Sequence, residues 1–164
     1  MKRNKLDKID LQIVSLLQDH GRMTNVELAE RVGISAPPCL RRVKALEDSG
    51  VIQSYHAHLD RMVFGYTVTV FVFVKLDKQT EEDLVAFEKH VDILPAVREC
   101  YMLAGDVDCI LKVVAKDWDD YQTFLRTHLT SAPNVSHVTS SLTMRSAKEA
   151  FGVPIDGVES LAAA

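Results

Sequence analysis

The sequence has few cysteines and no long apolar run, and these absences exclude several classes of protein. Its three cysteines are odd in number and lack the spacing of a metal-binding motif, so neither a disulfide framework nor a zinc site is expected. The longest apolar stretch, residues 70–74, is much too short to cross a bilayer. No apolar core follows the basic first residues, as it would in a signal peptide. We therefore expect a cytoplasmic protein with no membrane partner and no cofactor.

A large excess of charge of one sign is also lacking. The chain of 164 residues has a formal net charge of −4, which argues against a generally basic protein that coats nucleic acid. The first 60 residues nevertheless contain nine basic and eight acidic side chains, whereas the remainder contains ten and fifteen. Any nucleic acid should therefore meet the first part of the chain.

Residues 24–50 are predicted to form a helix-turn-helix. Thr24, followed three residues later by Glu27, forms a capping box that marks the start of a helix, and Gly33 can adopt the left-handed conformation that ends it. A short turn that contains glycine then suits two helices that cross at a steep angle. The apolar spacing gives the first helix an inward face of Leu28, Ala29 and Val32.

The second helix of the pair should combine an apolar face with a basic one. Leu40, Val43 and Leu46 recur at three-residue steps and are expected to face inward, and Gly50 should close the helix. The opposite face carries the cations Arg41, Arg42 and Lys44. Three cations alone would favour a plain helical hairpin with a solvated face, but their combination with the caps and the glycine turn favours nucleic-acid binding.

Two prolines complicate the start of this helix. Pro37 and Pro38 each disfavour helical geometry in the preceding residue, so we expect the regular helix to begin at about Pro38. Ser35 then lacks two of the amides that it would cap, and its hydroxyl is left for a phosphate. Arg42 is also a candidate to brace Glu47 or to reach the backbone. The candidate DNA contacts are Thr24, Asn25, Ser35, Pro37, Arg41, Arg42 and Lys44.

A further helix should precede the pair and support it. Asp7 can cap this helix with Asp10 at its third position, and Gly21 should end it. Its apolar stripe, Ile9, Ile13, Leu16 and Leu17, gives the helix-turn-helix a surface to pack against.

After Gly50 the apolar residues of 51–60 alternate, which predicts a strand that leads into a hinge over residues 60–65. His56 and His58 would share one face of this strand, as two metal ligands would. No third ligand stands at a useful spacing, so solvated histidines are favoured.

The second half of the chain changes to the alternation of strands. Strands are predicted over residues 67–76, 96–104, 107–115 and 135–144, and helices over 80–90 and 117–129. This βαββαβ order folds as a ferredoxin-like sheet with both helices on one face. Thr80 and Asp117 are the expected caps of the two helices.

The first of these strands is apolar on both faces. Its valines point one way, whereas Phe71 and Phe73 point the other way. Two helices can cover only one face, and exposed phenylalanines would form a patch typical of an interface. We expect a dimer through Phe71 and Phe73, with a monomer that exposes both rings as the alternative.

The loop between the middle strands offers a candidate ligand site. Gly105 favours a tight two-residue turn with uncovered amides, and Asp106 and Asp108, two residues apart, can face the same side. Amides can bind a carboxylate and an aspartate can bind an ammonium group, so this turn could hold a zwitterion. Taken alone, two solvated aspartates on an ordinary turn are the more common arrangement.

Residues 6–55 resemble the amino-terminal half of the Lrp/AsnC family of transcription regulators. The match lies in Asp10, Gly21-Arg22, residues 25–29, residues 35–42 and the run from Leu46-Glu47 to Gly50-Val51-Ile52, and the resemblance covers nearly the whole chain. It implies an α+β fold with an N-terminal winged helix-turn-helix domain followed by a ferredoxin-like βαββαβ domain. The implied boundaries are 1–52 for DNA binding, 53–65 for a linker strand and hinge, 66–145 for effector binding and oligomerisation, and 146–164 for a tail.

The resemblance also implies an amino-acid effector at the predicted hairpin. It makes Gly105, Asp106 and Asp108 effector-binding candidates, and it adds Met102, Ser141, Leu142 and Thr143. Cys109 stands where many relatives have an aromatic residue, so the chain departs from the family pattern at this position. The implied partners are double-stranded DNA, a small amino acid and further copies of the chain, as a dimer that assembles into tetramers or octamers.

Three other functions are alternatives to this one. An enzyme is disfavoured because no nucleophile–base pair and no metal cluster stand out in the sequence. An architectural DNA-binding protein without a ligand shares every feature except the hairpin. A redox sensor built on Cys39, which lies on the second helix of the pair, is the least favoured.

Overall fold

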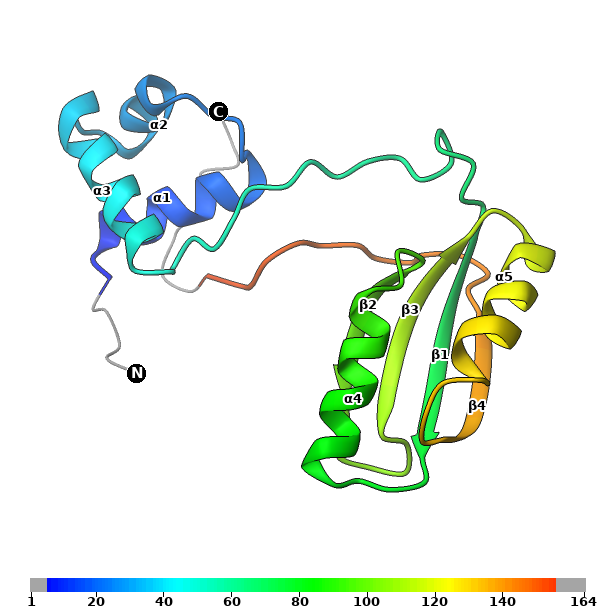
Figure 1. Cartoon of the computed structure of the whole chain (residues 1–164). Coiled ribbons are helices and arrows are strands. Elements are labelled where there is room, and N and C mark those ends of the chain that lie inside the picture. Colours follow the sequence, from blue (N-terminus) through cyan, green and yellow to red (C-terminus); the bar gives the residue numbers. More distant parts are fainter. Residues whose placement is uncertain (1–5, 156–164) are drawn as a thin grey trace. The chain divides into compact units, whose positions relative to one another are not determined.

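The computed structural model describes residues 6–155, and it divides into two compact units (Figure 1). Of the described residues, the first unit contains 6–58 together with 148–155, and the second contains 59–147. The end of the predicted tail, residues 156–164, lies outside the described residues. Within the described part of the chain, no helix is both long enough and apolar enough to cross a membrane.

The first unit contains three helices, α1 (Lys8–Asp19), α2 (Asn25–Val32) and α3 (Ala36–Asp48). Both predicted capping boxes are present, Asp7 with Asp10 on α1 and Thr24 with Glu27 on α2. The α2 helix ends at Gly33, whose φ of 74° is the left-handed conformation expected of a glycine cap. The α1 helix ends at Asp19, two residues before Gly21, with His20 as its cap.

The core of this unit differs from the prediction at one position of α3. Cys39 is fully buried, whereas Leu40 is 44% exposed, so the prediction that Leu40 faces inward is wrong. Successive helical residues are about 100° apart, and Cys39, Val43 and Leu46 therefore form a narrower stripe than one that starts at Leu40. The buried residues of this core are Ile13, Leu16, Leu17, Leu28, Ala29, Val32, Cys39 and Leu46.

The α3 helix also begins earlier than predicted, at Ala36 rather than at Pro38. Pro37 and Pro38 occupy the first turn, where backbone amides have no intrahelical partner, so their missing N–H groups cost no helical hydrogen bond. The first bond of the helix runs from the Cys39 amide to the Ser35 carbonyl at 3.3 Å. As predicted, the Ser35 side chain makes no capping bond.

Residues 51–60 do not form the predicted strand. A strand needs a neighbour for its backbone hydrogen bonds, and within the described residues the one sheet has all four of its strands in the second unit, after residue 67. The Tyr55 hydroxyl instead donates a hydrogen bond of 3.0 Å to the Glu47 carboxylate of α3. Burial is the main reason that the pKa of Tyr55 is raised to about 12, and the hydrogen bond to this carboxylate raises it further.

The described C-terminal segment packs against α1 within the first unit. The Gln18 side-chain amide donates to the Val153 carbonyl and accepts from the Val153 amide, both at 3.0 Å. The rings of Phe151 and His58 lie 4.8 Å apart. Gly152 permits this close approach, since its φ is 78° and an added Cβ would lie 2.1 Å from the Gln18 side chain.

The second unit has the predicted βαββαβ order. Its elements are β1 (Val68–Leu76), α4 (Glu81–Asp92), β2 (Val97–Met102), β3 (Cys109–Ala115), α5 (Trp118–Phe124), a π-helical turn η1 (Leu125–Leu129) and β4 (Val135–Leu142). Thr80 and Asp117 cap the two helices, as predicted. The sheet is antiparallel with the order β2-β3-β1-β4, and α4 and α5 lie on the same face (Figure 1). The predicted α+β class is confirmed.

Strand β1 separates a covered face from an open one. Val70, Val72 and Val74 are fully buried beneath the helices, where they join Phe87, Leu111 and Tyr121 in the core. Phe71 points to the other face and is 36% exposed. The expectation that the two helices leave the phenylalanine face uncovered is confirmed for this chain.

Candidate nucleic-acid interface and effector site

The outer face of α3 carries two cations that no described residue neutralises. Arg41 and Lys44 are both exposed, and neither forms an ion pair with any residue that the structure describes. They are three residues apart and therefore neighbours on the helix surface. Ser35 and Pro37 lie exposed at the N-terminal end of the same helix. This end of the unit can therefore offer positive charge and a hydroxyl group to a phosphate.

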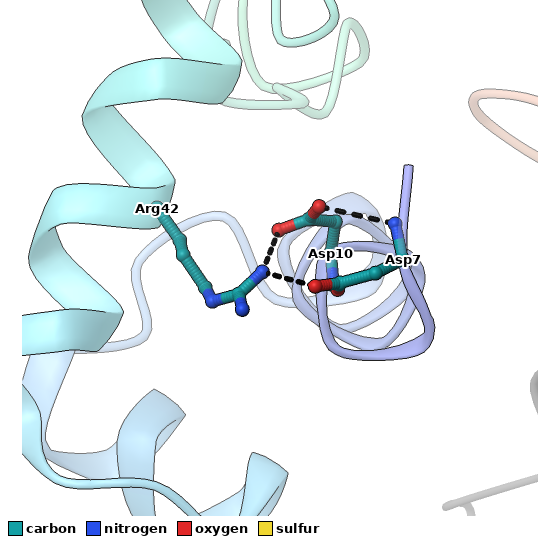
Figure 2. A network of polar contacts seen from close by, with 3 residues as sticks. All are labelled: Asp7, Asp10 and Arg42. Carbon is teal, nitrogen blue, oxygen red and sulfur yellow. Dashed lines mark hydrogen bonds and ion pairs between the residues drawn. The ribbon is translucent and has the colours of Figure 1, made fainter. Parts of the chain in front are cut away.

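Arg42 is used differently from Arg41. Its Nη1 donates to Oδ2 of Asp7 and to Oδ1 of Asp10, each at 2.7 Å, so one guanidinium nitrogen ties α3 to the N-terminus of α1 (Figure 2). The hydrogen bond from the Asp10 amide is the main cause that lowers the pKa of the Asp7 carboxyl, and the hydrogen bond from this guanidinium is the second. The hydrogen bonds to Asp10 and Asp7 raise the pKa of Arg42. Arg42 braces these aspartates rather than Glu47, which binds Tyr55.

Thr24 and Asn25 hold the N-terminal turn of α2. The Thr24 hydroxyl donates to Glu27 at 2.7 Å, and this bond, followed by the Thr24 amide, lowers the pKa of the Glu27 carboxyl. The Asn25 side chain donates to the Ala36 carbonyl at 2.9 Å and so connects the starts of α2 and α3. Thr24 therefore caps α2, and Asn25 connects α2 to α3.

Cys39 lies in the core of the first unit and is fully buried. Burial raises the pKa of its thiol, although the nearby Arg42 lowers it slightly. Because the thiolate is the reactive form, this position is unsuited to sensing oxidants, and the redox hypothesis loses its structural basis.

The loop between β2 and β3 is longer than the predicted two-residue turn. The Leu103 amide donates a hydrogen bond of 2.8 Å to the Asp108 carbonyl. This bond closes a loop of four residues, 104–107. Gly105 has no positive φ, and an added Cβ there would meet nothing within 4 Å. Gly105 and Asp106 are exposed to solvent.

Asp108 does not share the exposure of Asp106. It is only 9% exposed, and both of its carboxylate oxygens have partners within the chain. Oδ2 accepts from the Leu76 amide at 2.7 Å, and Oδ1 accepts from the Gln79 side chain at 2.6 Å. The prediction that Asp106 and Asp108 face one open side is therefore wrong. A buried carboxylate needs hydrogen-bond donors, and the end of β1 provides them.

The predicted effector residues fall into two groups at opposite ends of the sheet. Met102 pairs with Cys109, which also pairs with Val74, whereas Leu142 pairs with Val70. Four residues of β1 separate these positions, roughly 13 Å at 3.3 Å per residue, and three strand spacings of about 4.8 Å separate β2 from β4. The loop end and the Ser141–Thr143 end (Figure 1) therefore cannot line one small pocket within a single subunit.

The end of β4 has one unusual atom. Thr143 Oγ1 is buried and has no hydrogen-bond partner among the residues that the structure describes. Its backbone amide donates to the Thr69 carbonyl at 2.9 Å, so the side chain is held at a fixed place beside β1. An unpaired buried hydroxyl can accept or donate a bond to a further group.

The open face of the sheet combines apolar rings with polar neighbours. Phe71 lies beside Lys112 and Ser141, and Phe73 lies beside Ile110 and Thr139. Lys112 forms an ion pair of 2.8 Å with Glu99 on the same face, which lowers the pKa of the Glu99 carboxyl. This pairing neutralises the charge of Lys112 beside Phe71.

Sequence reasoning missed two positions that shape these sites. Leu40 was assigned to the core. It lies about 100° around the helix from Cys39, and this angle could have placed it outside the buried stripe of Cys39, Val43 and Leu46. Gln79 holds Asp108 from the loop after β1, and no spacing rule connects the two residues. Among the described residues, no three side chains of the metal-binding types gather into a site, and His56 and His58 are both exposed.

Comparison with known proteins identifies both units. Residues 6–53 match the winged helix-turn-helix DNA-binding model, and residues 69–153 match the Lrp/AsnC ligand binding domain. A leucine-responsive regulatory protein of Rhizobium meliloti is 47% identical over 153 residues, which cover 93% of this chain and 98% of that protein. A Bkd operon transcriptional regulator of Pseudomonas aeruginosa is 42% identical over 142 residues, which cover 87% of this chain and 93% of that protein.

A solved structure agrees with these relatives. A transcriptional regulator of Neisseria meningitidis in complex with L-Met superposes with a TM-score of 0.88 at 34% identity, over 93% of this chain and 98% of that one. The match extends over both units, and the two domain models together identify a DNA-binding domain followed by a ligand-binding domain. The chain therefore belongs to the Lrp/AsnC family and is a DNA-binding transcription regulator with an amino-acid-binding domain.

Proposed function

We propose that α3 enters the major groove of duplex DNA and that Arg41 and Lys44 provide its main contacts. The observation that carries this proposal is their exposure without an ion-pair partner among the described residues, on the face of α3 opposite the core. Ser35 and Pro37 lie at the entry to the helix, and Thr24 and Asn25 form the N-terminal turn of α2, where a phosphate is favoured by the helix dipole. Arg42 orients α3 through α1.

The salt dependence of DNA binding tests this assignment. Each phosphate contact contributes about 0.9 to the slope of log affinity against log salt. Arg41→Ala and Lys44→Ala should weaken binding. If the removed side chain contacts a phosphate, the slope should also become shallower by the contribution of about one phosphate contact. Lys89→Ala removes an exposed cation from α4 and serves as the matched control. Unchanged affinity and slope in both α3 variants would contradict the proposal.

The open face of the sheet is the proposed dimer interface. The exposed Phe71 and its neighbour Phe73 make an apolar centre, and a second copy of the same face would cover both. Such a dimer would present two copies of α3 to half-sites about one helical turn apart, roughly 34 Å, or a multiple of it, and dimers would assemble further into tetramers or octamers. Phe71→Asp with Phe73→Asp should dissociate the dimer in sedimentation experiments. A wild-type monomer at micromolar concentration would contradict this arrangement.

The effector is proposed to be a small amino acid bound where subunits meet. The neighbour from Neisseria meningitidis was solved with L-Met, which supports this class of ligand. Gly105, Asp106 and Met102 would come from one end of the sheet, and Ser141, Leu142 and Thr143 from the other, so two subunits would be needed to bring them together. Asp108 would fix the loop from within.

Binding measurements separate this function from its alternative. Asp106→Ala should weaken amino-acid binding in calorimetry and leave DNA binding without effector unchanged, because Asp106 lies in the second unit. If no amino acid binds at millimolar concentration, the protein acts as a ligand-independent architectural DNA-binding protein. In both cases the protein acts by binding rather than by catalysis, and it would meet its DNA in the cytoplasm.

A further inference from the structure

The outer face of α3 carries a single large apolar side chain beside its cations. Leu40 is 44% exposed and is absent from the core, whose α3 members are Cys39 and Leu46, with Val43 partly buried against them. Arg41 follows Leu40 directly, and Lys44 lies four residues on, one helical turn away. Pro37 precedes it by three residues on the same face. Leu40 is therefore at the edge of the surface proposed to meet DNA, next to Lys44.

An exposed leucine by itself needs no explanation, but its charged neighbours restrict what can cover it. A second copy of this face would bring Arg41 and Lys44 against their own copies, and like charges in contact repel. A nucleic acid suits the same neighbours, because its phosphates attract both cations. The surface thus favours DNA as the group that contacts Leu40.

A leucine side chain can make only apolar contacts with a base. In the major groove, the base edges present hydrogen-bonding nitrogen and oxygen atoms and one apolar group, the C5 methyl of thymine. We propose that Leu40 is a specificity-determining residue that recognises the C5 methyl group of thymine in the DNA half-site. This inference rests on the proposed entry of α3 into the major groove, and it names the base chemistry that the surface prefers.

The experiment uses the full-length protein and a duplex retained from a random DNA pool. Each thymine of the half-site is replaced in turn by uracil, which removes the C5 methyl and keeps every hydrogen-bonding group of the base. Burial of one methyl group contributes about a fourfold factor in affinity. Wild-type protein should lose about fourfold at one or two thymines of the half-site and nothing at the others.

Variants of Leu40 connect this loss to the side chain. Leu40→Gln and Leu40→Ala should bind the thymine duplex more weakly and should not distinguish uracil from thymine at those positions. Leu40→Met keeps an apolar end and should retain the distinction. Val63→Ala shortens a branched side chain that is 77% exposed in the second unit, and it should behave as wild type. Because Leu40 is exposed, its variants should keep the wild-type helical circular dichroism.

The outcomes separate this inference from the function on which it rests. Suppose that binding is selective and salt-dependent, but that replacing any thymine by uracil leaves the affinity unchanged. This result would overturn the role of Leu40 and keep the role of α3. The same holds if Leu40→Ala and Leu40→Gln retain the full sensitivity to uracil. If the wild-type protein retains no duplex from the pool, the DNA-binding proposal itself fails, and the role of Leu40 fails with it.

Discussion

The α3 helix and the β2–β3 loop each contain a close pair of like charges, Arg41 with Arg42 and Asp106 with Asp108, and in each of these pairs only one side chain is available to a ligand. Arg41 is exposed, whereas Arg42 is bound to Asp7 and Asp10. Asp106 is exposed, whereas Asp108 is bound to the end of β1. The bound member of each pair holds the element that presents the exposed member. Residue type and spacing therefore indicate where the site lies. Hydrogen-bond partners from distant parts of the sequence determine which side chain remains available to the ligand.

The largest effect that tests this comparison is expected at Asp108. Asp108→Ala leaves the Leu76 amide without its acceptor in a buried place, and lost hydrogen bonds to a charged group cost about 1.5–3 kcal/mol each. The free energy of unfolding of the second unit should fall by roughly 3 kcal/mol. Trp118, the one tryptophan of the chain, lies in α5 and reports this transition by fluorescence in urea.

Asp106→Ala is the control for this loss of stability. Its side chain is exposed, so its removal should leave the urea midpoint unchanged. Equal urea midpoints for Asp106→Ala and Asp108→Ala would contradict the claim that Asp108 stabilises the second unit and Asp106 does not.

The next effect is expected at Arg42. Arg42→Ala should lower the thermal stability of the first unit, which circular dichroism follows through its helices, because α3 loses its connection to α1. The slope of DNA affinity against salt should stay at the wild-type value, since we propose that Arg42 is held by α1 and does not contact a phosphate. Arg41→Ala should do the opposite, with a flatter slope and unchanged stability.

A charge exchange provides the control for the Arg42 pairing. The double variant Asp10→Arg with Arg42→Asp should regain part of the stability that each single change removes. A flatter salt slope in Arg42→Ala, with no loss of stability, would place Arg42 among the DNA contacts instead.

A smaller effect is expected from acid. Hydrogen bonds lower the pKa values of Asp7 and Glu27 in the folded state, so both carboxylates stabilise the first unit when ionised. Their contribution is complete above the unfolded pKa, at about pH 5, and is lost as the pH falls through the lower folded values, below about pH 4. Asp7→Asn should reduce the acid dependence of helical circular dichroism. A dependence equal to that of wild type would contradict the role of this cap.

The smallest effect is expected in the C-terminal segment. In Gly152→Ala the added methyl group would overlap the Gln18 side chain, so the two hydrogen bonds to Val153 should break. Hydrogen exchange at the Val153 amide should accelerate, with little change in global stability. Gly65→Ala has a similar φ of 79° but meets nothing within 4 Å, which separates the overlap from backbone strain.

The sequence predicted the elements well where the signal is local. The capping boxes at Asp7 and Thr24, the glycine that ends α2 and the alternation in β1 each depend on residues a few positions apart, and all of them are present. The order of strands and helices then limited the topology to one sheet with both helices on one face.

Predictions failed where the outcome depends on distant partners. The partners of Arg42 lie 32 and 35 positions away, and those of Asp108 lie 29 and 32 positions away. The alternation after Gly50 resembles that of a strand, but alternation does not provide the neighbour that a strand needs. Leu40 was misplaced because three-residue steps drift by about 60° per step around a helix, and the stripe from Cys39 drifts less.

The central claim is that amino-acid binding in the second unit and DNA binding by the first are coupled. The most direct test is calorimetry of single amino acids against the full-length protein, with and without a duplex that it selects. We predict that at least one small amino acid binds and changes DNA affinity, and that the duplex changes the affinity for that amino acid by the same factor, because coupling is reciprocal. A tenfold factor would need only about 1.4 kcal/mol. Amino-acid binding that is identical with and without the duplex would contradict the claim.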